Sequence, residues 1–147
     1  KDKAEDLGFD VKVYSEHFQG EADKLAKDIT LANNKPHQCL IGAGESTVVV
    51  KGKGIGGRNQ QLALAALLSI SENQVLITLA SDGHDNSESA GAIVDSSTLH
   101  RSSILNLSPS TYLDNNDSFH FFQEVGDSID TGLTGSNVAD LFVCVKS

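Results

Sequence analysis

The sequence predicts an α/β layered domain in which helices flank a mixed, mostly parallel sheet. Helix patterns alternate with short apolar strand patterns along the 147 residues, as in domains that stack helices on a sheet. The strand pattern VLITLA at 75–80 is apolar throughout, which is typical of a central strand covered on both faces. No internal repeat or low-complexity linker interrupts the chain, whose length suits one domain.

The first 32 residues are expected to form a helix, a strand and a second helix. The helix at 1–7 stops at Gly8, a residue type favoured just past helix ends. The strand at 10–14 alternates apolar and polar residues, and the helix at 20–32 places its apolar residues roughly along one face.

Two further strand patterns follow, separated by glycines at 42 and 44. Gln38–Ile41 is a short apolar run, and Ser46–Val50 is rich in branched side chains that pack well on a pleated surface. Because so few residues separate the two patterns, we expect them to pair antiparallel.

The middle of the chain holds a strong helix pattern at 58–70, whose apolar residues cover most faces and predict burial. A polar loop at 81–92 follows the central strand. The remaining expected elements are helices at 95–105, 109–116 and 118–125, a polar loop at 126–137 and a final strand at 141–145.

The composition excludes several classes of protein. A net charge of -9 with only 11 lysines and arginines argues against a broad nucleic-acid surface, which would be basic. No apolar run approaches the roughly 18 residues that a membrane-spanning helix needs. Cys39 and Cys144 lie in apolar strand patterns, so we expect two buried thiols in a reducing compartment. A cytoplasmic location is expected, with an organelle as the alternative.

Two features lead us to expect a piece of a longer polypeptide. The sequence contains no methionine. Its opening, KDKAEDLGFD, reads as the tail of an amphipathic helix. We therefore interpret residues 1–147 as a single domain of such a polypeptide.

The stretch KGKGIGGRNQQ, at 51–61, follows a strand pattern and leads into a helix. Its glycines spell G-x-G-x-x-G, and Asp82 lies at the end of the next strand, where a dinucleotide site needs an acid. Two lysines and Arg58 concentrate positive charge there, which is unusual for a dinucleotide loop and suits another phosphate-bearing ligand at a helix N-terminus. A structural glycine turn is the third interpretation, and all three stay open.

The loop after the central strand carries Ser81, Asp82, His84 and Asp85. Ligands of open α/β sheets bind at the carboxyl ends of the strands. Two aspartates three residues apart can hold Mg²⁺, orient it through water or take a proton from a hydroxyl. Helix capping within a solvated acidic loop is the structural alternative.

The loop TGLTGSN, at 131–137, is dense in hydroxyl, glycine and amide groups. Thr134, Ser136 and Asn137 offer neutral donors to phosphate or carboxylate oxygens, and the same residue types form ordinary turns. No G-x-S-x-G elbow and no metal-type spacing of cysteine or histidine occurs.

Together these loops resemble a known family. The segments GAGESTVVVKGKGIGGRNQQLALAALL, LITLASDGHDNSESAGAIVDSSTL and YLDNNDSFHFFQEVGDSIDTGLTGSNVADLFV are similar to the MOFRL domain. That domain is the C-terminal part of class II glycerate 2-kinases, which are also described as hydroxypyruvate reductases. The resemblance covers nearly the whole chain and implies an active site in a cleft against a larger, Rossmann-like N-terminal domain.

The activity that the resemblance implies is transfer of the ATP γ-phosphoryl group to the 2-hydroxyl of glycerate, with Mg²⁺. Arg58, in the GGRNQ motif, would bind the substrate carboxylate or the transferring phosphate, with Lys53 as the second candidate. Asp82 and Asp85 match the D-G-x-D pattern and would act in catalysis, Asp82 also as a metal ligand. Further residues expected along the cleft are Gly56, Gly57, Asn59, Thr134, Ser136 and Asn137.

The chain departs from the family pattern at two points. DGHDNSESAGA lacks the second glycine of the usual D-G-x-D-G, beside Asp85, and GAGEST replaces the commoner G-G-E-T-T. Two other functions are kept: an NAD(P)-dependent hydroxypyruvate reductase, and a non-catalytic ligand-binding or assembly module. Glycerate and the N-terminal domain are the expected partners, a homodimer is left open, and the domain alone is expected to be inactive.

Overall fold

A computed structural model describes residues 1–147 as six strands and six helices around one sheet. None of the helices combines the length and the apolar composition needed to cross a membrane. The strands are β1 Asp10–Glu21, β2 Gln38–Thr47, β3 Gln74–Ala80, β4 Gly91–Val94, β5 Ser128–Ile129 and β6 Asp140–Lys146, and the helices are α1 Asp2–Asp6, α2 Ala22–Ala32, α3 Arg58–Ala66, α4 Ser96–Ile104, α5 Pro109–Asp114 and α6 Ser118–Val125.

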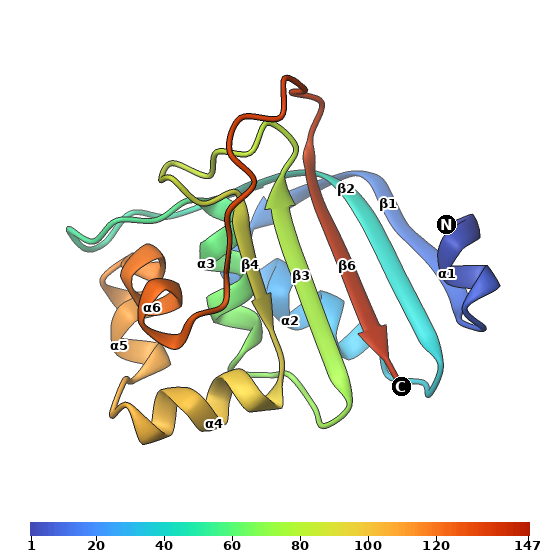
Figure 1. Ribbon diagram of the computed structural model, residues 1–147, viewed down its shortest axis with the longest axis horizontal. Coiled ribbons are helices and arrows are strands. Elements are labelled where there is room, and N and C mark those ends of the chain that lie inside the picture. The colour runs from blue at the N-terminus through green and yellow to red at the C-terminus, as the bar shows by residue number, and fades with distance from the viewer.

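The sheet is mixed but mostly antiparallel, so the predicted mostly parallel sheet is wrong. Its strand order is β1-β2-β6-β3-β4-β5 (Figure 1), and only β1 and β2 pair in parallel. The strands β2 and β3, joined through α3, point the same way, but β6 lies between them and pairs antiparallel with both. The strand β6 was predicted, but its position between β2 and β3 leaves no local signal in the sequence. This position makes the sheet mostly antiparallel.

A single strand, β2, replaces the two antiparallel strands predicted at 38–50. It runs straight through Gly42 and Gly44, which pack closely instead of forming a turn. A Cβ atom at Gly42 would lie closer than 3.0 Å to the Phe142 ring, and one at Gly44 closer than 3.0 Å to the Phe18 backbone. Glycine within a strand often marks such a close approach.

The other predicted elements are found, with shifted boundaries. The first strand extends beyond its predicted end to Glu21, and α3 ends at Ala66, before the predicted end at residue 70. The strands β4 and β5 were not predicted, because runs of 4 and 2 residues are too short to show a periodic pattern.

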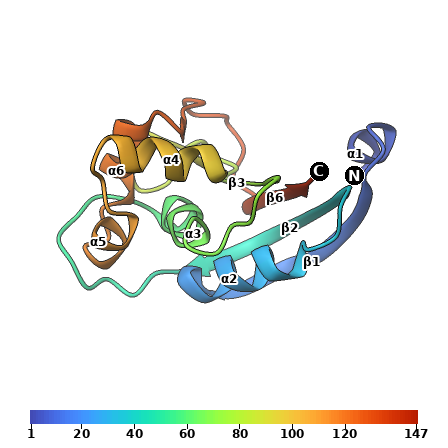
Figure 2. The same ribbon diagram turned by 90° about the horizontal axis from the view of Figure 1, so that it is seen from below.

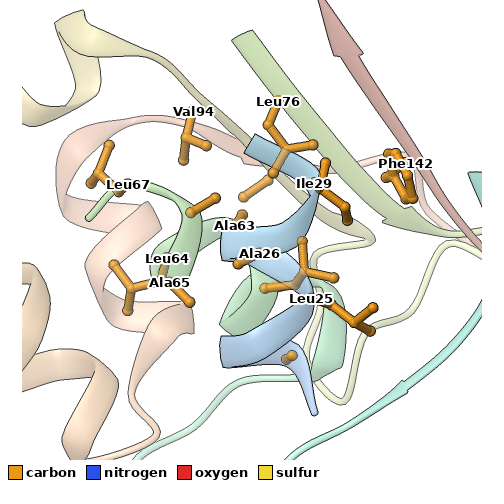
Figure 3. Packing of buried hydrophobic residues seen from close by; sticks show 14 of the residues in the cluster. Leu25, Ala26, Ile29, Ala63, Leu64, Ala65, Leu67, Leu76, Val94 and Phe142 are labelled. Atoms are coloured by element: carbon orange, nitrogen blue, oxygen red, sulfur yellow. The ribbon is translucent and has the colours of Figure 1, made fainter. Parts of the chain in front are cut away.

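The core lies between the sheet and the helices on one of its faces. In Figure 2, α2 and α3 lie on the same side of the sheet, and Figure 3 shows their side chains packed toward Leu76 and Phe142 of the strands. The helix α3 is buried almost throughout, as predicted. Buried and half-buried side chains alternate along β3, so the predicted covering of this strand on both faces is wrong. Both cysteines are buried and free, as predicted.

Candidate active site

Three loops meet at the carboxyl end of β3, the edge of the sheet where the sequence predicted a site (Figure 1). Residues 81–90 follow β3, residues 130–139 precede β6, and residues 48–57 lead into α3. The first two loops are tied together, since the N–H groups of Val138 and Ala139 donate to Ser81 Oγ at 2.9 and 3.1 Å. These hydrogen bonds hold the first two loops together beside the third.

Two cavities open at this edge, and both are lined by Arg58 and His84. The larger cavity measures about 590 Å³ and the smaller about 250 Å³. The larger one is also lined by Ser46, Gly56, Gly57, Gln61, Asp85 and Asn86, and the smaller one by Glu45, Ser81, Asp82, Asn137 and Asp140.

The first half of the glycine-rich loop, Lys51–Ile55, is bound to the turn between α5 and α6, Asn115–Asp117. All five of its backbone N–H groups donate to this turn. Lys51 and Gly52 donate to Asn116 Oδ1 at 2.6 and 3.0 Å, Lys53 to Asn115 Oδ1 at 3.2 Å, Gly54 to the Asn115 carbonyl at 2.9 Å, and Ile55 to Asp117 Oδ1 at 3.0 Å.

The glycines of this half allow the backbone to reach the turn. A Cβ atom at Gly52 would lie closer than 3.0 Å to the Asn115 backbone, and one at Gly54 closer than 3.0 Å to Asp117. These amides have their acceptors within the chain, so they are not available to a pyrophosphate. The side chain of Lys53 is exposed and lines neither cavity. For Lys51–Ile55 the contacts therefore favour the structural turn over the dinucleotide loop.

The second half of the loop, Gly56–Arg58, differs. No group in the chain accepts a hydrogen bond from its three successive N–H groups. All three residues line the larger cavity, which also reaches Gly54 of the first half. Free amides at a helix N-terminus, together with the helix dipole, attract anions. The hydroxyl of Ser46, which lines the same cavity, is buried and also lacks a partner.

Asp85 anchors the start of α3. Its carboxylate is buried and accepts from the N–H groups of Asn59 at 3.1 Å and Gln60 at 2.8 Å, and from Asn59 Nδ2 at 3.2 Å. Burial raises the pKa of Asp85, and these donors oppose the rise. At Gly57 a Cβ atom would lie closer than 3.0 Å to Asp85, so this glycine lets the acidic loop pack on the helix start.

Arg58 lies between two carboxylates. Its Nη1 contacts Glu45 Oε1, while its Nε lies 3.3 Å from Asp140 Oδ2 and its Nη2 lies 3.4 Å from Asp140 Oδ1. Burial raises the pKa of Asp140, and its contacts with Asn59 and Arg58 oppose the rise. Sequence reasoning missed both acids. Glu45 stands in the GAGEST segment, but Asp140 gave no signal because it is 82 residues from Arg58.

The remaining predicted site residues are placed unevenly. Asp82 and Asn137 line the smaller cavity, and Asp82 Oδ1 accepts from the His84 N–H at 3.0 Å. Thr134 and Ser136 line neither cavity; the Thr134 hydroxyl bonds to the Ser81 carbonyl and helps to join the loops. Asn59 is buried below the site. No group of three or more His, Cys, Asp or Glu side chains is arranged to hold a metal ion.

The fold and the site define an α/β domain in which a helix N-terminus and an arginine line a cavity at one edge of the sheet. Residues 38–140 match the MOFRL family. The chain belongs to the MOFRL family, as the loops predicted.

Similar proteins are glycerate kinases. The D-glycerate 2-kinase of Thermotoga maritima is 36% identical, with 97% of this chain and 37% of that protein covered. The glycerate 2-kinase of Picrophilus torridus is 38% identical, with 86% and 31% covered. The crystal structure of glycerate kinase from Thermotoga maritima matches with a TM-score of 0.92 and 35% identity, over 100% of this chain and 38% of that one. The chain thus spans less than two fifths of the length of these relatives.

Proposed function

We propose that this domain forms one wall of the active site of a glycerate 2-kinase, which transfers a phosphoryl group from ATP to the 2-hydroxyl of glycerate and gives 2-phosphoglycerate. The other wall is assigned to the rest of such a kinase, because the chain spans 37% of the D-glycerate 2-kinase of Thermotoga maritima. Catalysis of phosphoryl transfer depends chiefly on positioning the reactants and neutralising charge.

One observation carries the proposal. Gly56, Gly57 and Arg58, whose backbone N–H groups have no acceptor in the chain, line the same cavity of about 590 Å³. Backbone amides and an arginine fork both suit the oxygens of a phosphate or a carboxylate. We assign Arg58 the role of neutralising the substrate carboxylate or the transferring phosphate. The backbone N–H groups of Gly56 and Gly57 are assigned to hydrogen bonds with the same anion.

Asp82 is the residue that we assign to Mg²⁺. Its Oδ2 has no partner in the chain, and it lines the smaller cavity together with Glu45 and Asp140. Mg²⁺ on a kinase substrate keeps several waters and takes one or two carboxylates beside the phosphates, so a single aspartate with a free oxygen fits that demand. When bound, the ion would neutralise charge on the phosphate oxygens of ATP.

The remaining residues are assigned supporting roles. Asp85 uses both carboxylate oxygens on the backbone of α3, so we assign it to holding the anion-binding amides in place, with Asn59 beside it. Thr134 and Ser136 hold the loop that carries Asn137 toward the smaller cavity. Lys53 is exposed on a loop outside both cavities, and we assign it at most a contact with ATP or with the other wall.

A chimera tests the proposal. Residues 1–147 replace the matching part of the Thermotoga maritima D-glycerate 2-kinase, and two reactions are measured on the same preparation. ATP-dependent formation of 2-phosphoglycerate is the expected result, without oxidation of NADH or NADPH by hydroxypyruvate. The control is the same kinase lacking this segment, which should be inactive. Oxidation of a nicotinamide cofactor without phosphorylation would favour the reductase. A folded chimera active in neither reaction would favour a non-catalytic module.

A further inference from the structure

The two carboxylates that contact Arg58 lie in very different surroundings. The side chain of Asp140 is 3% exposed, whereas that of Glu45 is 68% exposed. Asp140 begins β6 opposite Gly44 of the neighbouring strand β2, so the two acids approach Arg58 from adjacent strands. The Arg58 side chain between them is 42% exposed, which leaves part of it open to a ligand.

The contacts divide the guanidinium into two edges. The edge formed by Nε and Nη2 faces the two oxygens of Asp140, at 3.3 and 3.4 Å. This arrangement resembles the paired contacts that favour arginine over lysine as a carboxylate partner. The remaining nitrogen, Nη1, contacts only Glu45. One edge is therefore held by a buried acid and the other by an exposed one.

The two ion pairs differ in how easily they can be broken. Exposed pairs contribute little to stability, because water and salt compete with them. Breaking a buried pair leaves an uncompensated charge in a low-dielectric environment, which is strongly unfavourable. Asp140 Oδ2 has no well-aligned hydrogen-bond donor, so Arg58 is the only cation that compensates the charge of this buried carboxylate. An incoming anion can therefore displace Glu45 far more readily than Asp140.

We propose that Glu45 is an exchangeable partner of Arg58, which occupies Nη1 until a phosphate or carboxylate of the ligand replaces it. Asp140 is the positioning residue that keeps the guanidinium oriented during this exchange. The inference deepens the proposed function and rests on it for the identity of the anion, namely the substrate carboxylate or a phosphate group. Because Glu45 is itself negative, its displacement favours ligands that carry an anionic group over neutral ones.

Calorimetric measurement of inorganic phosphate binding to the 147-residue chain tests the exchange. Glu45→Gln removes the competing charge and should tighten phosphate binding by about fivefold, the upper range for an exposed ion pair. The matched control is Glu72→Gln, which makes the same change of charge at an exposed site just before β3, at the opposite end of that strand from the cavities. The control should leave the affinity unchanged, since the separation of roughly 20 Å exceeds the screening length.

The positioning role of Asp140 needs a second readout. Asp140→Asn also removes a negative charge, but it frees the guanidinium from its orienting partner, so it should weaken phosphate binding by about thirtyfold, the low end for truncating one partner of a buried charge pair. It should also speed hydrogen exchange at Arg58 Nε, followed by NMR, whereas Glu45→Gln should leave that proton protected. Loss of stability without a change at Nε would reduce Asp140 to a structural residue and overturn its part of the proposal. If Asp140→Asn does not fold, exchange at Arg58 Nε in the unaltered chain decides: a protected proton supports the positioning role, and rapid exchange overturns it.

Equal or weaker phosphate binding by Glu45→Gln would overturn the exchange, and so would the absence of saturable phosphate binding by the unaltered chain. In the chimera, Glu45→Gln should lower the KM for the substrate whose anionic group binds Arg58. A chimera without kinase activity whose Glu45→Gln variant still binds phosphate more tightly would refute the proposed kinase and leave the exchange standing.

Discussion

The two halves of the glycine-rich loop are adjacent in sequence, but their backbone N–H groups are bonded differently. In Lys51–Ile55 every backbone N–H group has an acceptor in the turn Asn115–Asp117. In Gly56–Arg58 none of the three has an acceptor, although these residues begin a helix, where free amides attract anions.

This difference shows that the spacing of glycines does not establish a phosphate-binding loop. What matters is whether the backbone N–H groups of the motif already have acceptors within the chain. The G-x-G spelling of the first half serves close packing between two backbones. The second half owes its character to Asp85, which binds the amides of Asn59 and Gln60 and leaves the preceding ones free.

Arg58→Ala in the chimera should have the largest effect, because it removes the only cation of Gly56–Arg58. We expect kcat/KM for glycerate phosphorylation to fall about 1,000-fold, the range for losing an arginine that stabilises a transferring phosphate. Arg58→Lys should recover only part of this, since an ammonium lacks the planar fork. Steady-state kinetics measure both variants, with circular dichroism to check the fold. Activity near that of the unaltered chimera would refute the role of Arg58.

Asp85→Ala should have the next largest effect, and on stability. It leaves two helix N–H groups without their buried acceptor, which should lower the free energy of unfolding by about 3 kcal/mol. Urea denaturation measures the loss. Asp114→Ala is the matched control, because Asp114 is exposed and takes part in no ion pair. A loss below about 0.5 kcal/mol, the range of ordinary surface substitutions, would contradict the anchoring role.

Gly52→Ala should show that Lys51–Ile55 contributes to stability and not to ligand binding. The added methyl group overlaps the Asn115 backbone, so we expect a loss of about 2 kcal/mol in the free energy of unfolding. Phosphate affinity of the folded protein should stay unchanged, because Gly52 lines neither cavity. The exposed neighbour Lys53 serves as control: Lys53→Ala should change neither quantity appreciably. Weaker phosphate binding by folded Gly52→Ala would break the distinction between the halves.

The smallest effect concerns the titration of Asp140. Burial raises its pKa above 3.8, Arg58 lowers it and Glu45 raises it. Arg58→Ala should therefore raise the pKa further, and Glu45→Gln should lower it, which carbon-13 NMR of the carboxyl group measures. A raised pKa favours the folded state below pH 3.8, and this contribution is lost as the pH rises through the folded value. Opposite shifts would contradict the electrostatic contacts assigned to Asp140.

Much of the fold could be predicted from local patterns. The helix α3 and the strand β3 were found because long apolar runs are distinctive. The pairing of strands was not, because β6 is inserted between β2 and β3 from the end of the chain. The continuity of β2 was also missed, because Gly42 and Gly44 are turn formers in sequence, and their contacts with Phe142 and Phe18 are not local.

The candidate site could be predicted in part. The predicted residues Arg58 and Asp82 line the cavities, because a cation at a helix start and an acid at a strand end are local signals of such a position. The acceptors in Asn115–Asp117 and the pairing of Arg58 with Asp140 join segments far apart in the chain. No periodicity or spacing within one segment reports such contacts, so the division of the loop into two halves needed the structure.

Anions are expected to bind at Gly56–Arg58 and not at Lys51–Ile55. Titration of the nitrogen-15-labelled chain with inorganic phosphate tests it directly, because each backbone N–H gives its own NMR signal. The signals of Gly56, Gly57 and Arg58 should shift with one saturable curve, while those of Lys51–Ile55 stay in place. Saturable shifts confined to Lys51–Ile55, or none in either half, would contradict the claim.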